Sequence, residues 1–220
     1  MHRRAPTSVP YWNVSMAKDD WFRSADWNDA IEGAFFEKLQ RAKRKAQYLR
    51  IQGYTLAEKH PKVALRLLDQ YFTLGDHFDD APAYVDRASA YLSLGETELA
   101  IKSCEQALSV EDLRPTVKTS AYILLPFIIA THSIKSRYRQ AIDLLNQHHD
   151  RPAFPVEHFR WHASHALIAS ELGDKAAARI HAQRALEEAA RDHSGFRYHG
   201  NIGLVGDSFG KLRERLTALS

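Results

Sequence analysis

Residues 81–114 restrict the fold of this chain more than any other stretch. Tyr84, Ala88 and Tyr91 recur at helical spacing on one face, and Leu94-Gly95 follows as a stop signal. A second apolar stripe comes directly after the stop: Leu99, Ala100, Ile101, Cys104, Ala107 and Leu108. The stretch therefore predicts two helices joined by a tight turn.

The alternation of small and aromatic residues indicates how such a helix pair packs. Small side chains at Ala88, Ala100 and Ala107 let helices approach closely, while Tyr84 and Tyr91 fill the gaps between neighbouring helices. One pair cannot bury both of its apolar faces, so it needs stacked neighbours. The pattern predicts an array of helix pairs.

This stretch resembles a tetratricopeptide repeat. Five of seven family positions are filled in kind, by Tyr84, Ala88, Tyr91, Ala100 and Cys104. Arg87 and Asp112 depart from the pattern, because the family usually has Leu and Pro there. The resemblance implies an all-α, right-handed α-solenoid of helix-turn-helix hairpins that acts as a non-enzymatic, protein- or peptide-binding scaffold or adaptor.

Weaker relatives of the repeat lie on both sides, which gives about four hairpins over residues 45–190. In the first hairpin Ala64 aligns with Ala100, and in the fourth Gly173 matches Gly95. The third resembles the family least: we expect a long first helix over residues 117–134, kinked by Pro126. Residues 1–44 read as an aromatic extension with a first helix, and residues 191–220 as a Gly-rich loop with a capping helix over 208–219.

The aromatic extension allows two interpretations. Asp26 is the expected N-cap of a helix over residues 27–41. Trp12, Trp21 and Trp27 lie close together in sequence, and exposed Trp is favoured at binding hot spots. We favour the other interpretation, in which these rings pack against the end of the solenoid.

Composition narrows the class of protein. The 220-residue chain has a formal net charge of +3, too weak a bias to imply nucleic acid. Its single cysteine, Cys104, excludes a disulfide framework and should be an inert core residue. No apolar run is long enough for a membrane span or a signal peptide, so we expect a cytoplasmic protein.

The family resemblance implies that the first helix of each hairpin lines a concave groove for another protein or a peptide. Aligned in this way, the groove positions are Leu49, Gly53, Leu56, Val85, Ser89, Leu92, Ser93, Arg160, Ala163, Leu167 and Ser170. Arg160 is the expected anchor for an acidic group. The lysine and asparagine clamp of some chaperone-binding members has no counterpart, which disfavours a C-terminal peptide.

A basic run supplies the alternative function, a nucleic-acid-associated regulator. Its members are Lys38, Arg41, Lys43, Arg44, Lys45 and Arg50. These residues straddle a helix junction, and their stems also suit the covering of apolar surface. We therefore place nucleic acid second to a protein partner, and self-association into a homo-oligomer stays open.

No catalytic or cofactor site emerges from the motifs. Gly210-Lys211 precedes a helix, but Val205 and Leu212 stand where a phosphate-binding loop needs Gly and Ser or Thr. His158, His162 and His165 can share one helical face, which is a hypothesis for a metal-dependent enzyme or sensor. We expect instead that these histidines pack between helices, with no metal and no cofactor.

Overall fold

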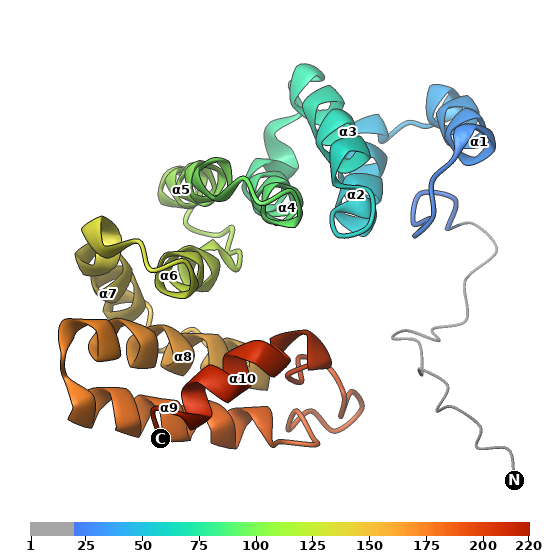
Figure 1. The fold of residues 1–220 in the computed structure, drawn as a ribbon. Helices are drawn as coiled ribbons and strands as arrows, with labels where there is room; N and C mark the ends of the chain where they lie inside the picture. Colours follow the sequence, from blue (N-terminus) through green and yellow to red (C-terminus); the bar gives the residue numbers. More distant parts are fainter. Residues whose placement is uncertain (1–19) are drawn as a thin grey trace, which may run out of the picture.

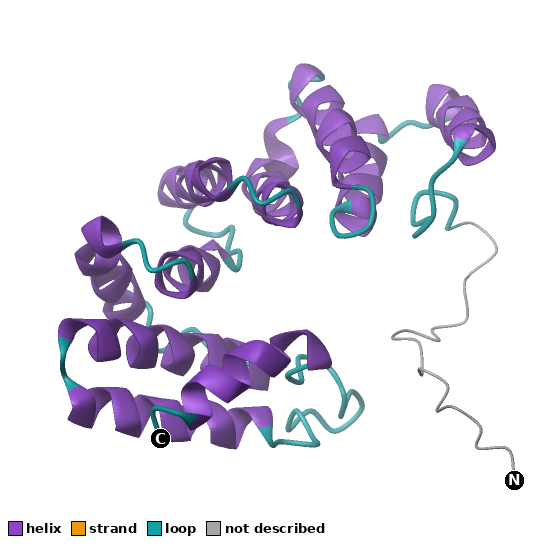
Figure 2. Ribbon diagram, in the orientation of Figure 1, coloured by secondary structure: helices purple, strands orange, loops and turns teal. Residues whose placement is uncertain are grey.

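The computed structural model describes residues 20–220, and Trp12 with most of the predicted extension lies outside that range. Ten α-helices and three short 3₁₀ turns make up the described part, in which no strand occurs (Figure 2). The helices are α1 (Asp29–Arg41), α2 (Lys45–Leu56), α3 (Pro61–Thr73), α4 (Asp80–Ser93), α5 (Thr97–Leu113), α6 (Ala121–Thr131), α7 (Tyr138–Gln147), α8 (Pro155–Leu172), α9 (Lys175–Ala189) and α10 (Gly210–Thr217). The 3₁₀ turns are η1 (His77–Asp79), η2 (Lys135–Arg137) and η3 (Asp207–Phe209).

The helices pack in four consecutive pairs, α2–α3, α4–α5, α6–α7 and α8–α9. Figure 1 shows these pairs following one another along an arc, with α2, α4, α6 and α8 on its inner side. The protein is therefore an all-α solenoid, and this prediction is confirmed. Between residues 20 and 220, no helix is both apolar enough and long enough to cross a bilayer.

Small residues form the close contacts that the sequence predicts. Ala88 of α4 and Ala100 and Ala107 of α5 are fully buried. Tyr84 stacks on Phe72 of α3 with 4.6 Å between the ring centroids, so it fills the gap to the preceding pair. Close approach within a pair and aromatic filling between pairs thus follow from the same short pattern.

The turns inside three of the helix pairs share one backbone design. Gly95 has φ 77° after α4 and Gly173 has φ 86° after α8. The residue after each glycine donates its backbone N–H to a carbonyl of the preceding helix. Glu96 donates to Tyr91 of α4, and Asp174 donates to Ala169 of α8, both at 2.9 Å. Ser133 adopts the same left-handed conformation, with φ 54°, after α6. These residues end each first helix as a left-handed C-cap does.

The third pair, α6–α7, keeps the register of α4–α5, but it contains a three-residue insertion. Matching Ser133 to Gly95 puts Tyr122 at the place of Tyr84 and Pro126 at the place of Ala88. The second helix is then offset by three residues, which form the turn η2. The resemblance looked poor because the sequence alignment followed that second helix.

The prediction of a long helix over residues 117–134 was wrong, because α6 begins only at Ala121. The residues before it are held by a side chain of α5. The buried Glu111 carboxylate accepts hydrogen bonds from the backbone N–H and the hydroxyl of Thr119. Arg151 lies 3.3 Å from the same carboxylate and donates to the Thr119 carbonyl. These bonds give the chain an alternative to helix at this point.

The N-terminal helix also differs in detail from its prediction. Asn28, and not Asp26, caps α1, because its side chain accepts from the backbone N–H of Ile31 at 3.0 Å. Trp21 and Trp27 are half-buried and pack on Phe35 at centroid distances of 5.3 and 5.6 Å. Within the described part, the aromatic residues of the extension therefore cover the start of the solenoid.

The C-terminal segment covers the other end. Helix α10 packs on α9 and α8 through the buried Leu212 and Leu216 (Figure 1). The preceding loop is fixed to the start of α8, where the Val156 N–H donates to the Gly203 carbonyl at 2.8 Å. Two features require glycine at position 203. Its φ is 67°, and a Cβ atom would lie 2.5 Å from Phe154. The solenoid thus has a cover at both ends.

Candidate functional site

The inner face of the arc is open at its start and covered at its end. Gly53, Ala88, Pro126 and Ala166 occupy equivalent positions in the four inner helices, and the residue after each lies about 100° further round its helix. These next residues are Tyr54, Ser89, Phe127 and Leu167. Tyr54 is 60% exposed, Ser89 and Phe127 are half-buried, and Leu167 is 4% exposed. Only the half built on α2 and α4 presents a free inner surface.

Five of the eleven predicted groove residues have no surface to offer. They are Leu49, Gly53, Leu56, Ala163 and Leu167, all buried. Val85, Ser89, Leu92, Arg160 and Ser170 are half-buried, and Ser93 is exposed. The five buried residues fail as groove lining for two separate physical reasons.

A register error of one residue explains why the three buried residues of α2 were assigned to the groove. A Cβ atom on Gly53 would lie 3.0 Å from Leu68 Cγ and 3.4 Å from the Ala64 carbonyl, so Gly53 faces α3. Gly53 therefore occupies the close-contact position that Ala88 holds in α4. One residue turns a helix by about 100°, which moves Arg50 and Tyr54 to the inside. A glycine 35 residues before Ala88 was the sequence signal for this register.

The C-terminal cover explains the burial of the two predicted groove residues in α8. Ala163 and Leu167 share one apolar cluster with Leu212 and Leu216 of α10. Phe209 of η3 meets Phe159 of α8 at 5.1 Å and Phe127 of α6 at 6.0 Å between ring centroids. Residues that would line a groove in a middle repeat are here part of the core.

Arg160 lies at the border between the open and covered halves. Its guanidinium carbon is 5.5 Å from the ring centroids of both Phe127 and Phe209. Its Nε atom is buried and has no hydrogen-bond partner in the described structure. The carboxylate of Glu157, one turn earlier, instead accepts from the backbone N–H groups of Ala153 and Phe154. Burial lowers the pKa of Arg160, and Glu157 offsets only part of that shift.

The open half has its own buried ion pair. Arg50 Nε donates to Asp86 at 3.1 Å, and Asp79 lies 3.8 Å from the same guanidinium. Burial raises the pKa of Asp86 to about 7, against the lowering effect of Arg50. A pocket of about 520 Å³ opens here, and its lining includes Arg44, Arg50, Asp79 and the 81% exposed Phe78.

The basic run is mostly on the surface. Five of its members are exposed, namely Lys38, Arg41, Lys43, Arg44 and Lys45. Arg41 pairs with Glu37 at 3.1 Å. Arg50 is held by Asp86 and is therefore not free for a phosphate. The run lies on α1 and at the start of α2, at the N-terminal end of the arc.

Two of the three predicted histidines, His162 and His165 of α8, pack against His181 of α9. His162 and His181 lie 3.0 Å apart through their Nδ1 atoms, and His165 stacks on His181 with 4.8 Å between centroids. Burial, followed by the charge of His181, lowers the pKa of His162 and of His165 to about 4. Residues 20–220 contain no group of three or more His, Cys, Asp or Glu placed to hold a metal ion. Burial also raises the pKa of the Cys104 thiol to about 12, which keeps it unreactive.

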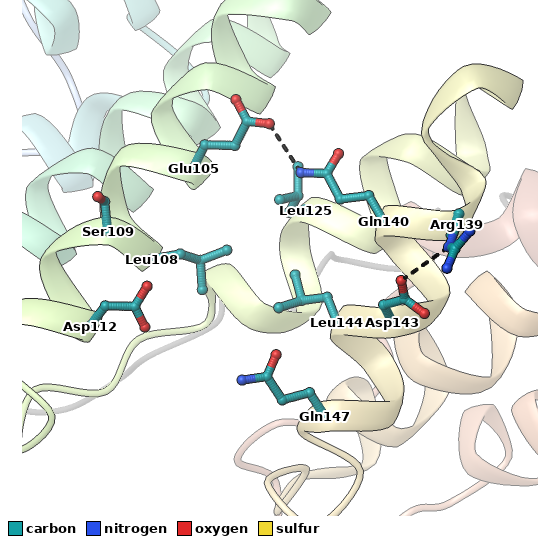
Figure 3. Close-up of a pocket in the computed structure, with 10 residues that line it drawn as sticks. All are labelled: Glu105, Leu108, Ser109, Asp112, Leu125, Arg139, Gln140, Asp143, Leu144 and Gln147. Atoms are coloured by element: carbon teal, nitrogen blue, oxygen red, sulfur yellow. Dashed lines mark hydrogen bonds and ion pairs between the residues drawn. The ribbon is translucent and has the colours of Figure 1, made fainter.

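A second surface feature lies on the outer side, between α5 and α7. This outer pocket has a volume of about 630 Å³ and is lined by Glu105, Leu108, Ser109, Asp112, Leu125, Arg139, Gln140, Asp143, Leu144 and Gln147. Helix α6 contacts both α5 and α7 and supplies Leu125 to the floor. Figure 3 shows Leu108 and Leu144 directed toward the pocket from opposite sides. Sequence reasoning missed these residues, because no motif distinguishes them from ordinary helix surface.

Comparison with known proteins agrees with this architecture. The tetratricopeptide repeat family model matches residues 81–112, which cover all but one residue of α4 and all but one of α5. Searches of curated proteins and of solved structures found no match to the chain. The matched pair and the four stacked helix pairs lead to one conclusion: the chain is a tetratricopeptide-like helical repeat protein.

Proposed function

We infer that the protein is a non-enzymatic scaffold that holds another protein or a peptide on the inner face of its arc. The observation that carries this inference is the exposure gradient from Tyr54 to Leu167. The C-terminal cover closes one half of the inner face, while α2 and α4 stay open. A large aromatic ring left 60% exposed beside a free inner surface is typical of an interaction site.

The binding surface is smaller than the sequence predicts. Its open part consists of Tyr54, Val85, Ser89, Leu92 and Ser93 on α2 and α4, and half-buried Phe127 and Arg160 form its border with the covered half. The apolar part, with Val85 and Leu92, is half-buried and suits aliphatic side chains of a ligand. Ser89 and Ser93 add hydroxyl groups, although each now donates to a carbonyl one turn earlier in α4.

Arg160 indicates the charge of the ligand group that binds beside it. The Arg160 side chain is half-buried beside two aromatic rings, and its buried Nε atom has no hydrogen-bond partner in the described structure, so pairing with a ligand would satisfy this donor. A planar carboxylate is its best complement, because Arg donates two parallel hydrogen bonds. We therefore expect an acidic side chain of the ligand near Arg160, with aliphatic neighbours toward α4.

Site-specific photo-crosslinking in cells that naturally produce the protein tests this function. A benzophenone amino acid replaces Tyr54 or Ser93 on the inner face, or Ile180 on the outer helix α9 as the control; Ile180 is 50% exposed. The inner positions should crosslink one common protein that the control position does not reach. Identical crosslinking patterns from all three positions would overturn the assignment of the inner face.

An Arg160→Gln variant then tests the acidic contact. We expect weaker crosslinking from Ser93 to the same partner, with the helical circular dichroism spectrum retained. Arg160→Lys should restore part of the signal through charge alone. Unchanged crosslinking in Arg160→Gln would remove the acidic group from the proposal while leaving the inner face in place.

Nucleic-acid binding is the second candidate, and the exposure of five neighbouring cations favours it. Replacing Lys43, Arg44 and Lys45 with Glu should abolish any salt-dependent shift of an oligonucleotide in a native gel. A shift in the native protein that this variant loses would favour the rival over the scaffold. Sedimentation of the same samples reports whether the chain forms a homo-oligomer.

A further inference from the structure

The outer pocket between α5 and α7 combines an apolar floor with an acidic rim. Leu125 is 1% exposed at the bottom, and Leu108 and Leu144 are half-buried beside it. The lining holds three carboxylates, Glu105, Asp112 and Asp143, against one guanidinium. This local balance is opposite to that of the whole chain, in which 30 Lys and Arg residues outnumber 27 Asp and Glu residues.

The three carboxylates are not equivalent. Glu105 accepts from Arg137 at 2.7 Å and from Gln140 at 3.1 Å, so its charge is already matched. Asp143 and Arg139 lie 3.8 Å apart, and both side chains are largely exposed, which makes their pairing weak. None of the ion pairs within residues 20–220 includes the Asp112 carboxylate. Figure 3 places Asp112 next to Leu108 at one side of the pocket.

We propose that the outer pocket docks a short basic segment of a partner protein, with an aliphatic side chain on the leucine floor and a Lys or Arg side chain on Asp112. A volume of about 630 Å³ lies in the range of ligand-binding pockets and exceeds what a single ion needs. The long apolar stem of Lys or Arg runs along leucine while its charged end reaches a carboxylate. Phosphate-bearing partners and acidic segments meet the wrong sign of charge here.

The proposal goes beyond the scaffold function because it adds a second, separate surface. The groove ligand is expected to bring an acidic group to the inner side, whereas the outer pocket takes a basic one. Two ligands of opposite charge can then be held on opposite sides of the same helix pairs. Failure of either proposal leaves the other standing, since they share no residue.

Fluorescence anisotropy with two labelled peptides tests the proposal on the purified full chain. The first peptide repeats the unit Leu-Arg-Ser-Leu-Lys-Ser, and the second carries Glu in place of each Arg and Lys. We expect the basic peptide to bind and the acidic peptide not to bind. Affinity should fall when salt is raised from about 50 to about 500 mM, because exposed charges are screened. Equal binding of the two peptides would overturn the proposal.

Variants of the rim sharpen the test. Asp112→Asn with Asp143→Asn should weaken the basic peptide about fivefold to tenfold, the value for one or two exposed ion pairs. The matched control, Glu58→Gln with Glu187→Gln, removes the same charge from exposed positions elsewhere and should change nothing. Asp112→Lys should go further and favour the acidic peptide. Equal losses in the two double variants would show a general charge effect and overturn the site.

A second copy of this chain is the competing occupant, since its own basic run carries Lys43, Arg44 and Lys45. Sedimentation velocity over a concentration series distinguishes the two cases. A monomer that binds the basic peptide supports the proposal. A dimer that Asp112→Lys dissolves would assign the pocket to self-association and overturn a foreign partner.

Discussion

The second and fourth helix pairs, α4–α5 and α8–α9, follow one register and yet end in different environments. A constant offset of 78 residues relates them, so that Ala88 matches Ala166, Gly95 matches Gly173 and Ala100 matches Ala178. The inner side of α4 is open, whereas Ala163 and Leu167 of α8 lie under the C-terminal cover. The repeat pattern therefore dictates the contacts within a pair but not the exposure of its inner side.

This difference shows that neighbouring segments, and not the repeat position alone, decide whether a residue lines an open groove. Ser89 and Leu167 occupy the same position, one polar and half-buried, the other apolar and 4% exposed. Each side chain suits the environment in which the structure places it. A position-by-position transfer from a family thus holds for contacts that the hairpin makes with itself, and fails for contacts that another segment supplies.

Exchanging these two residues gives the largest expected effect. Leu167→Ser should reduce the free energy of unfolding by about 3–5 kcal/mol, because it leaves a cavity and a polar group in the core. Ser89→Leu should change it by no more than about 0.5 kcal/mol, since the side chain stays on an accessible face. Urea unfolding monitored by circular dichroism measures both. Comparable losses would mean that the inner side of α4 is as covered as that of α8.

Enlarging the close-contact residues should affect both pairs alike. Ala88→Leu and Ala166→Leu replace fully buried methyl groups at equivalent positions. Overpacking at such sites costs about 1–3 kcal/mol in each variant. Urea unfolding of the two variants side by side is the measurement. A loss confined to one of them would break the shared register on which the comparison rests.

The sequence predicted those parts of the fold that depend on local pattern. The helix pairs, the small contact residues and the glycine turns at Gly95 and Gly173 all follow from spacing and backbone conformation. The register of α2 was missed, because Gly53 was assigned to the groove instead of the helix contact. The length of α6 was missed because Glu111, distant in sequence, holds Thr119 out of the helix.

The candidate site was less predictable for the same reason. Burial of Ala163 and burial of Leu167 depend on residues 40 or more positions later, and no local pattern announces which face a terminal helix will cover. Arg160 was identified by charge alone, and its aromatic neighbours became visible only in three dimensions. The outer pocket arises where α5 and α7 both pack on α6.

The histidines distinguish the two pairs by pH. His162 and His165 stand where α4 has Tyr84 and Arg87, and burial lowers the pKa of each imidazole to about 4. In the unfolded chain the value is about 6.5. Between these values the unfolded chain binds protons that the folded chain refuses, so stability should fall as pH drops from about 6.5 to 4. The thermal midpoint, followed by circular dichroism, should decrease over this window.

A variant isolates that effect from other groups. His162→Tyr, which copies α4, removes one of the two strongly shifted imidazoles, so the stability lost between pH 6.5 and 4 should be smaller than in the native chain. Asp86 acts in the opposite direction, because its pKa is raised to about 7 in the folded state. That contribution is the same in both proteins and cancels in the comparison. An unaltered pH profile in His162→Tyr would assign the acid sensitivity to another part of the chain.

The smallest expected effect concerns the turns that the two pairs share. Gly95→Ala and Gly173→Ala each place a Cβ atom on a left-handed residue, which costs about 1 kcal/mol. Neither site has atoms within 4 Å of the added carbon, so strain in the backbone is the whole cost. The losses in urea unfolding should agree within about 0.5 kcal/mol. A clearly larger loss at Gly173 would mean that the C-terminal cover also depends on this turn, and the shared design would then end at α8.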